Sequence, residues 1–111
     1  MSTTLVKYEH GVVLAVKNDL AGDALDSFNE RVERCMSEGH YNIVVDCSAV
    51  TGIDSAGLEA LADLQDRCED AFGSVKLSGL DETLVKILEI TRLERKFELF
   101  QDVDAAVGSF A

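Results

Sequence analysis

Apolar and polar residues follow two different periods along this chain. Five short runs rich in branched apolar residues are typical of β-strands. They lie at residues 5–8, 12–16, 41–46, 74–78 and 97–100. Elsewhere, apolar residues recur at spacings of three and four, which predicts helices that pack through one face. These helices are expected at residues 23–38, 54 or 55 to 71, 80–90, and a short stretch after Asp102.

The order of these elements predicts an α/β fold. Two strands come first, and strands then alternate with helices, which indicates a largely parallel sheet with right-handed crossovers. The opening hairpin adds an antiparallel edge. The length of 111 residues favours one domain. We therefore expect a single domain over residues 1–111, with a mixed, mostly parallel sheet and about four helices.

The ends of the helices also carry signals. We expect Asp23 to cap the first helix, and Gly39 and Gly73 to end the first and second helices. The second helix should bury one apolar face, which Gln65 interrupts with a polar side chain. The apolar residues expected on this face are Leu58, Leu61, Ala62, Cys68 and Phe72.

Composition narrows the classes of function. Apolar residues make up 47% of the chain, which favours a folded domain over disorder. The net charge of −11 argues against binding nucleic acid or an anionic membrane surface. No apolar run approaches the ~20 residues that span a bilayer, and no secretory signal is visible. We therefore expect a cytoplasmic protein without membrane insertion.

The three cysteines do not form a recognisable metal or redox motif. Their positions are widely spaced, and the two histidines do not complete a set of metal ligands with them. We expect reduced, mostly buried thiols at Cys35, Cys47 and Cys68, and we expect no metal and no cofactor.

The most informative segment is the turn from the third strand into the second helix. The strand ends at Asp46, and the helix opens at residues 54–58 with Asp-Ser-Ala-Gly-Leu. Binding sites in α/β sheets tend to lie beyond the carboxyl ends of strands. Asp54 or Ser55 could simply cap the helix, which chemistry alone favours. Alternatively, Ser55 could accept a phosphoryl group, which a helix N-terminus tolerates, although Asp54 would repel it.

Other residues of this segment allow two interpretations each. Gly57 is either tolerated at a helix start or required because a partner or a neighbouring loop approaches closely. Asp46 and Asp54 could perform acid–base chemistry, but a strand-end hydrogen bond and a helix cap explain them more simply. Ser55 has no nearby base in the sequence. We therefore expect no catalytic residue and no enzymatic activity.

These motifs resemble the STAS domain, the fold of bacterial anti-sigma factor antagonists. Residues 43–58 are similar to the hallmark strand, loop and Asp-Ser-x-Gly-Leu of that family. Residues 19–24 resemble the loop before its first helix, and residues 84–93, followed by Phe97, resemble its late helix and exit. Two positions differ: Arg92 stands where many relatives have Gly, and Ala56 replaces a second Ser found in some.

The resemblance implies a phosphorylation switch. Ser55 would be the phosphoacceptor, and the partners would be an anti-sigma factor serine kinase and a serine phosphatase. The unphosphorylated protein would bind the kinase and so release a sigma factor. The alternative is a constitutive STAS scaffold or accessory subunit, in a stress-signalling assembly or a lipid-transport complex. The partner-binding residues that the resemblance implies are Asp19, Gly22, Asp23, Asp54, Ser55, Ala56, Gly57, Leu58 and Glu59.

Acidic residues also follow Ser55 along one face of the second helix, at spacings of four and three. This stripe is either a solvated outer face or a surface complementary to a basic partner, whose binding would then weaken with salt. The acidic residues are Glu59, Asp63, Asp66 and Asp70.

Overall fold

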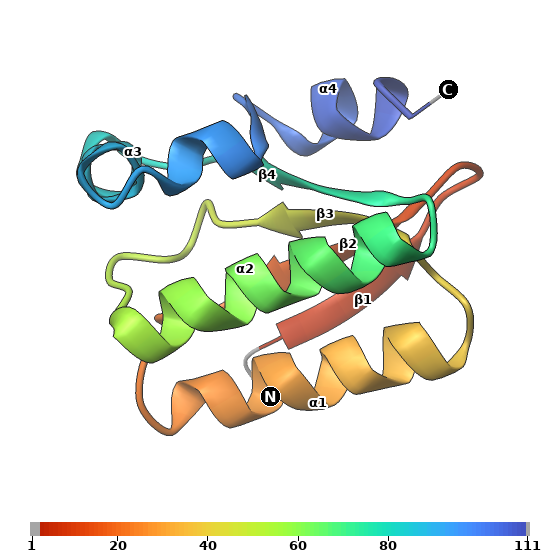
Figure 1. Ribbon diagram of the computed structural model, residues 1–111, viewed down its shortest axis with the longest axis horizontal. Helices are drawn as coiled ribbons and strands as arrows, with labels where there is room; N and C mark the ends of the chain where they lie inside the picture. Colours follow the sequence, from red (N-terminus) through yellow and green to blue (C-terminus); the bar gives the residue numbers. More distant parts are fainter. Residues whose placement is uncertain (1–2, 111) are drawn as a thin grey trace.

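The computed structural model describes residues 3–110 as a five-stranded sheet with helices on both faces (Figure 1). The elements follow the predicted order, with one short 3-10 helix, η1, that the sequence pattern did not indicate. Their bounds are β1 (Thr3–Lys7), β2 (Val12–Val16), α1 (Ala24–Ser37), β3 (Asn42–Asp46), α2 (Ser55–Asp70), β4 (Ser74–Ser78), α3 (Glu82–Ile90), η1 (Leu93–Lys96), β5 (Glu98–Phe100) and α4 (Val103–Gly108).

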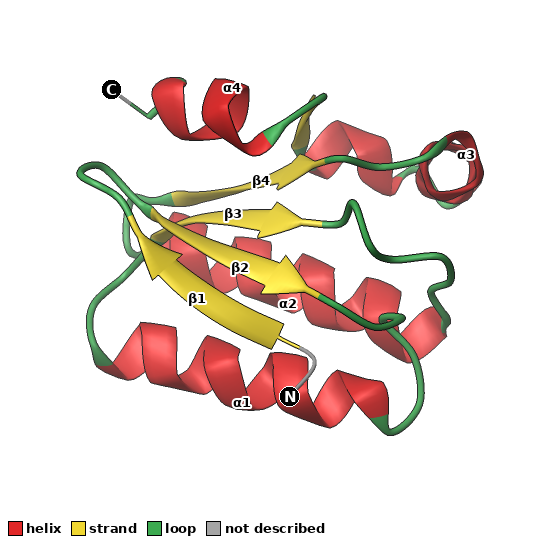
Figure 2. Cartoon of the chain, turned by 180° about the vertical axis from the view of Figure 1, so that it is seen from behind, coloured by secondary structure: helices red, strands yellow, loops and turns green. Residues whose placement is uncertain are grey.

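The strands lie in the sheet in the order in which they occur in the chain. β1 pairs antiparallel with β2, and β2, β3, β4 and β5 pair parallel with one another. Figure 2 shows the hairpin of β1 and β2 at one side of the sheet. This arrangement confirms the expected α/β class: a mostly parallel mixed sheet with an N-terminal hairpin and four α-helices.

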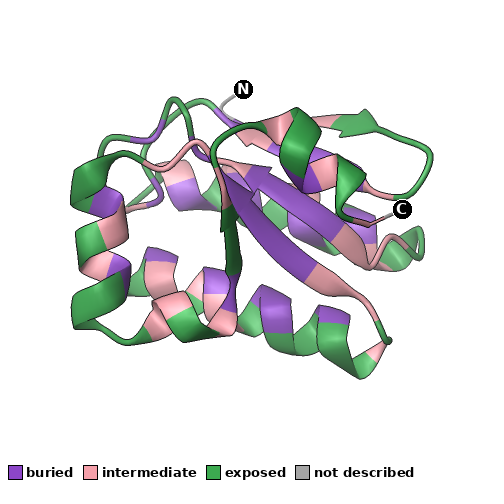
Figure 3. Cartoon of the chain, turned by 90° about the horizontal axis from the view of Figure 1, so that it is seen from above, coloured by how far each residue is buried: buried purple, intermediate pink, exposed green. Residues whose placement is uncertain are grey.

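Two hydrophobic clusters hold the helices against the sheet. The larger lies between the sheet and the helices α1 and α2, and includes the fully buried Phe28, Leu14 and Ile43. The smaller lies on the other face, where α4 covers Val13 and Val44. Figure 3 shows that buried positions concentrate on the central strands and on the inward faces of the helices.

The end of α2 differs from the prediction. Phe72 is fully exposed and has a left-handed backbone (φ 65), so its expected place in the core is wrong. Leu64 is buried on that helix instead. Gly73 has another reason to be glycine, because an added Cβ would lie 2.0 Å from the carbonyl oxygen of Tyr41. The left-handed residue that follows the helix is therefore Phe72, and Gly73 permits close packing.

The start of α1 also differs from the prediction. Asp23 occupies the cap position, but its side chain makes no capping hydrogen bond, so the expected side-chain cap is wrong. Backbone contacts replace it, since the amide of Leu25 donates to the carbonyl oxygen of Gly22 at 3.1 Å. At the other end of α1, Gly39 has a φ of 79 and follows the helix as expected.

Gln65, the polar interruption of α2, is buried because it binds neighbouring backbone. Its side-chain oxygen accepts a hydrogen bond from the amide of Val75 at 2.7 Å, and its Nε2 donates to the carbonyl oxygen of Lys96 at 2.6 Å. One side chain thus joins α2 to β4 and to η1. These bonds satisfy the polar atoms that burial would otherwise penalise.

Within residues 3–110, no helix combines the length and the apolar character needed to cross a bilayer. The same residues contain no cluster of three or more His, Cys, Asp or Glu side chains arranged to hold a metal ion. The three thiols are free and buried, as predicted. Burial raises the pKa of Cys35 and Cys68 to about 11 and that of Cys47 to about 12.

Candidate functional site

Two loops leave the carboxyl ends of β2 and β3 and run side by side. Leu20 and Ile53 form an isolated parallel bridge between them. The amide of Leu20 donates to the carbonyl oxygen of Gly52 at 3.0 Å, and the amide of Asp54 donates to that of Leu20 at 3.3 Å. Figure 1 shows both loops at one end of the sheet, opposite the β1–β2 turn. The two segments that the sequence singled out therefore form one surface.

Asp19 holds the second loop against the first. Its Oδ1 accepts hydrogen bonds from the hydroxyl of Thr51 at 2.8 Å, the amide of Thr51 at 3.1 Å and the amide of Gly52 at 3.0 Å. The pKa of Asp19 lies below its ordinary value of 3.8, chiefly because of the Thr51 hydroxyl. The carboxylate is thus a structural acceptor as well as an exposed charge of this surface.

Asp54 connects the start of α2 to the first loop. Its Oδ1 accepts the amide of Gly57 at 2.8 Å and so caps the helix, while its Oδ2 accepts the amide of Gly22 at 3.2 Å. Of the two residues that could cap α2, the structure therefore uses Asp54. Ser55 is the first helical residue, and its side chain is exposed outside the cap.

Gly57 is buried at the point where α2 meets the first loop. An added Cβ would lie 2.0 Å from the carbonyl oxygen of Leu20 and 2.8 Å from Cγ1 of Ile53. Of the two interpretations of this glycine, close approach by a neighbouring loop is the one that the structure supports. Leu58, the next residue, is half-buried and packs against the main core.

The remaining predicted residues face outward around Ser55. Gly22, Asp23, Ala56 and Glu59 are all exposed. The small residues among them are Gly22, Ser55 and Ala56. The acidic residues around them are also exposed, and these are Asp19, Asp23, Asp54, Glu59 and Asp63. The result is a patch of small residues with an acidic rim.

The acidic stripe of α2 is not uniform. Asp66 forms an ion pair with Lys96 of η1, with 2.6 Å between Oδ1 and Nζ. Arg67 binds Glu33 of α1 through two hydrogen bonds of 2.6 and 3.0 Å. Asp66 is therefore the one member of the stripe that forms an ion pair among the described residues, and the carboxylates of Glu59 and Asp63 near Ser55 form none.

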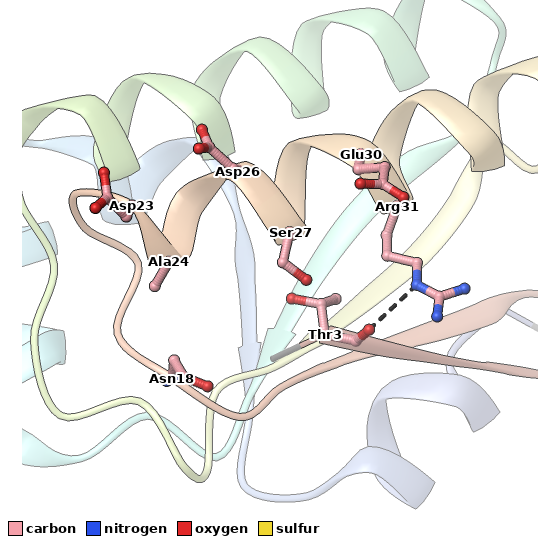
Figure 4. Close-up of a pocket in the computed structure, with 8 residues that line it drawn as sticks. All are labelled: Thr3, Asn18, Asp23, Ala24, Asp26, Ser27, Glu30 and Arg31. Atoms are coloured by element: carbon pink, nitrogen blue, oxygen red, sulfur yellow. Dashed lines mark hydrogen bonds between the residues drawn. The ribbon is translucent and has the colours of Figure 1, made fainter. Parts of the chain in front are cut away.

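An open pocket of about 930 Å³, lined mostly by polar residues, adjoins this surface between the start of β1 and the first half of α1 (Figure 4). Asp23 lines it, and so belongs both to the pocket and to the predicted partner surface. At its other end, Nε of Arg31 donates to the carbonyl oxygen of Thr3 at 3.2 Å. Ser55 does not line this pocket.

The surroundings of Ser55 offer no imidazole that could act as a base. His10 lies in the β1–β2 turn, and His40 lies in the turn before β3, where both line a pocket at the opposite end of the sheet. Asp46, the other carboxylate of the segment, accepts the amide of Ser48 at 3.0 Å. Asp46 thus makes a hydrogen bond at the end of its strand and Asp54 caps a helix, which are the structural roles that the sequence favoured over acid–base chemistry.

The pattern of residues missed Leu20 and Thr51 as parts of this site. Both act through contacts between the two loops, which are separated by about thirty positions in the chain. Thr51 supplies two of the three donors to Asp19, and the backbone of Leu20 makes two hydrogen bonds to the second loop, which form the bridge to Ile53. An apolar Leu within a polar loop was the only local signal.

Comparisons with known proteins agree with this geometry. The sequence model of the STAS domain matches residues 3–106. The fold is similar to that of a candidate anti-sigma factor antagonist from Thermotoga maritima, with 19% identity, coverage of 97% of this chain and 93% of that chain, and a TM-score of 0.91. It is also similar to that of an anti-sigma factor antagonist from Mycobacterium paratuberculosis. The identity is 18%, the coverage is 97% of this chain and 92% of that chain, and the TM-score is 0.83.

The fold is also similar to that of the Bacillus cell fate determinant SpoIIAA in its phosphorylated form. The identity is 15%, the coverage is 98% of this chain and 99% of that chain, and the TM-score is 0.78. At these identities, the structural similarity establishes the fold, and the match to the family establishes the membership.

Proposed function

The chain belongs to the STAS domain family, and on this premise we propose that it is an anti-sigma factor antagonist controlled by phosphorylation of Ser55. The unphosphorylated protein binds an anti-sigma factor serine kinase and so releases a sigma factor. Transfer of a phosphoryl group from ATP to Ser55 ends this binding, and a serine phosphatase restores it. Because the kinase uses ATP, the switch operates in the cytoplasm.

The observation that carries this proposal is the position of Ser55. It is exposed, it is the first residue of a 16-residue helix, and Asp54 rather than Ser55 caps that helix. The hydroxyl can therefore be modified without loss of the cap. The N–H groups and the dipole of the helix favour a phosphate at this end, whereas the neighbouring carboxylate of Asp54 opposes it.

The contacts between the two loops support the proposed partner surface. Asp19 and Asp54 fix the loop at residues 17–23 beside the start of α2, so the exposed Gly22 and Asp23 lie beside the exposed Asp54, Ser55, Ala56 and Glu59. Small side chains at its centre let a partner backbone come close, and the acidic rim favours a basic or uncharged contact face. Association should therefore weaken as salt is added.

The test uses the intact protein, ATP and the serine kinase encoded beside it or captured with it. Mass spectrometry should locate one phosphate on Ser55, which Ser55→Ala should abolish. Ser48→Ala is the matched control, because Ser48 is also exposed in this segment, and it should leave phosphorylation unchanged. Ser55→Asp should weaken binding to the kinase by about tenfold or more.

Two outcomes would count against the proposal. Phosphate on the Ser55→Ala variant would place the acceptor elsewhere. Unchanged kinase binding by Ser55→Asp would remove the switch and favour a constitutive STAS scaffold or accessory subunit instead.

A further inference from the structure

The face of the sheet opposite α1 and α2 is covered by the last segment of the chain. Residues 101–102 connect β5 to α4, a helix of six residues. Ala106 of this helix is buried against Val13 and Val44 in the smaller hydrophobic cluster. In Figure 1, α4 lies above the strands, whereas α1 and α2 lie below them. The second cluster is thus separate from the main core.

A lysine is buried under this segment. Lys76, in the middle of β4, is only 6% exposed. Its Nζ donates to Oγ of Ser109 at 2.6 Å, pairs with Oε1 of Glu98 at 3.2 Å, and lies 4.4 Å from the centre of the Phe110 ring. Ser109 in turn donates to the carbonyl oxygen of Ala106 at 2.6 Å, so its hydroxyl is oriented to accept. The partners of Lys76 therefore come from β5, α4 and the residues just after α4.

This lysine and α4 depend on each other. A buried ammonium group is costly unless it is paired, and two of its partners, Ser109 and Phe110, directly follow α4, so docking of α4 supports its buried position. A helix of six residues is not stable alone in water, so α4 forms only when it is docked. The main core, by contrast, contains no residue of α4 among its buried members.

We propose that α4 is a strap that opens as a unit, latched by Lys76, while the main core remains folded. Opening separates Ser109 and Phe110 from Lys76 and uncovers the apolar side chains of Val13 and Val44. Segments held by few buried contacts open at lower free energy than a core does. Lys76 is therefore an amine that becomes accessible in the open state.

The first experiment compares local opening with global unfolding in the unaltered full chain. Lysines are acetylated with a small amine-reactive reagent, thiols are alkylated in parallel, and mass spectrometry follows each site. The rates at each site are divided by those of the urea-unfolded chain. Lys86 is the exposed control, and Cys35, fully buried in the main core, reports global unfolding.

The expected result is that Lys76 reacts more slowly than Lys86 but is protected at least about tenfold less than Cys35. Equal protection of Lys76 and Cys35 would overturn the proposal, because α4 would then open only when the whole domain unfolds.

The second experiment loosens the latch. Phe110→Ala removes the ring beside Lys76, whereas Phe72→Ala is the matched control, because the Phe72 side chain is fully exposed. Phe110→Ala should speed acetylation of Lys76 about tenfold without changing alkylation of Cys35. Phe72→Ala should change neither rate. A parallel increase at Lys76 and Cys35 in Phe110→Ala would contradict an independent strap.

Discussion

The close contact between Gly57 and the first loop makes an unusual prediction for Gly57→Ala. In an ordinary helix, this substitution stabilises the protein by about 1 kcal/mol, because glycine is a poor helix former. Here the added Cβ would lie 2.0 Å from the carbonyl oxygen of Leu20, whereas ordinary contacts begin near 3.4 Å. Since the obstacle is backbone, it cannot rotate away. The expected sign is therefore reversed, and the variant should be less stable.

The magnitude follows from the contacts that must give way. Overpacking a tight site typically costs about 1–3 kcal/mol. Moving the Leu20 carbonyl also weakens its hydrogen bond from the amide of Asp54, which is already 3.3 Å long, at a net cost of about 1 kcal/mol. After the helix-forming gain is subtracted, we expect a loss of about 1–3 kcal/mol. For a domain of this size, the melting temperature falls by about 4 °C for each kcal/mol.

Urea unfolding followed by far-UV circular dichroism measures this loss directly. Gly108→Ala is the matched control, because Gly108 also lies in a helix and an added Cβ there meets nothing within 4 Å. The control should be neutral or slightly stabilising. A Gly57→Ala variant as stable as the unaltered protein, or more stable, would refute the claim that this glycine is required by the neighbouring loop.

Two further predictions concern the core. Gln65→Ala leaves the amide of Val75 and the carbonyl of Lys96 unpaired, so it should lower the free energy of unfolding, measured in urea, by about 2–4 kcal/mol. Gln101→Ala, at an exposed position, should change this free energy little. Equal stability of the two variants would contradict the claim that Gln65 joins α2 to β4 and η1. Stability should also fall as the pH rises above 9, because unfolded thiols ionise near their ordinary pKa of 9.0 while the folded thiols stay protonated up to a pKa of about 11 to 12. Urea midpoints between pH 7 and pH 10.5 check this fall, which should be shallower in a triple-alanine variant; an equal or steeper fall in that variant would contradict the role of the thiols. The thiols are those of Cys35, Cys47 and Cys68.

The fold could be predicted because the two hydrophobic periods differ and because they alternate. Runs such as Val12–Val16 are buried strands of a parallel sheet, and such strands are continuously apolar. The acidic and polar residues between them mark the solvent-facing sides of helices. What these local patterns could not supply was η1, because its four residues are too few to show a period.

The errors at helix ends have physical causes that lie outside the local pattern. Phe72 has the spacing of a core residue, but α2 ends before it, and Gly73 must approach the backbone of Tyr41. At the turn after α3, by contrast, the backbone conformation is the one expected of the family although the residue differs. Arg92 has a φ of 64, so the backbone keeps the left-handed conformation that favours glycine, although this chain has arginine there. The departure from the family pattern at Arg92 therefore leaves the turn itself in place.

The site could be predicted only in part for the same reason. Asp54 and Ser55 are neighbours in a motif, and a helix start can be recognised from a few residues. The hydrogen bonds between Asp19 and Thr51 join positions 32 apart, and their existence depends on the parallel pairing of β2 with β3. Without the register of the sheet, the sequence cannot show that Asp19 positions the second loop.

The rigidity of this surface bears on how a phosphate at Ser55 would act. Asp54 and Gly57 hold the start of α2 against the first loop, so the contact face is formed before any partner arrives. A phosphate would therefore act on the partner rather than by rearranging the loops. Negative charge alone would strengthen contact with a basic surface, so the acidic rim cannot explain release.

Phosphoryl transfer itself resolves this conflict. To modify Ser55, the proposed kinase must bring the terminal phosphate of its nucleotide to the serine hydroxyl. At the centre of the interface, the proposed partner would therefore be anionic, whereas the acidic residues of the rim would meet basic or uncharged side chains around it. A phosphate on Ser55 would face the nucleotide phosphates at short range in a water-poor interface, where like charges repel most strongly. Under the proposed function, the rim would thus favour association, and repulsion at the centre would cause release.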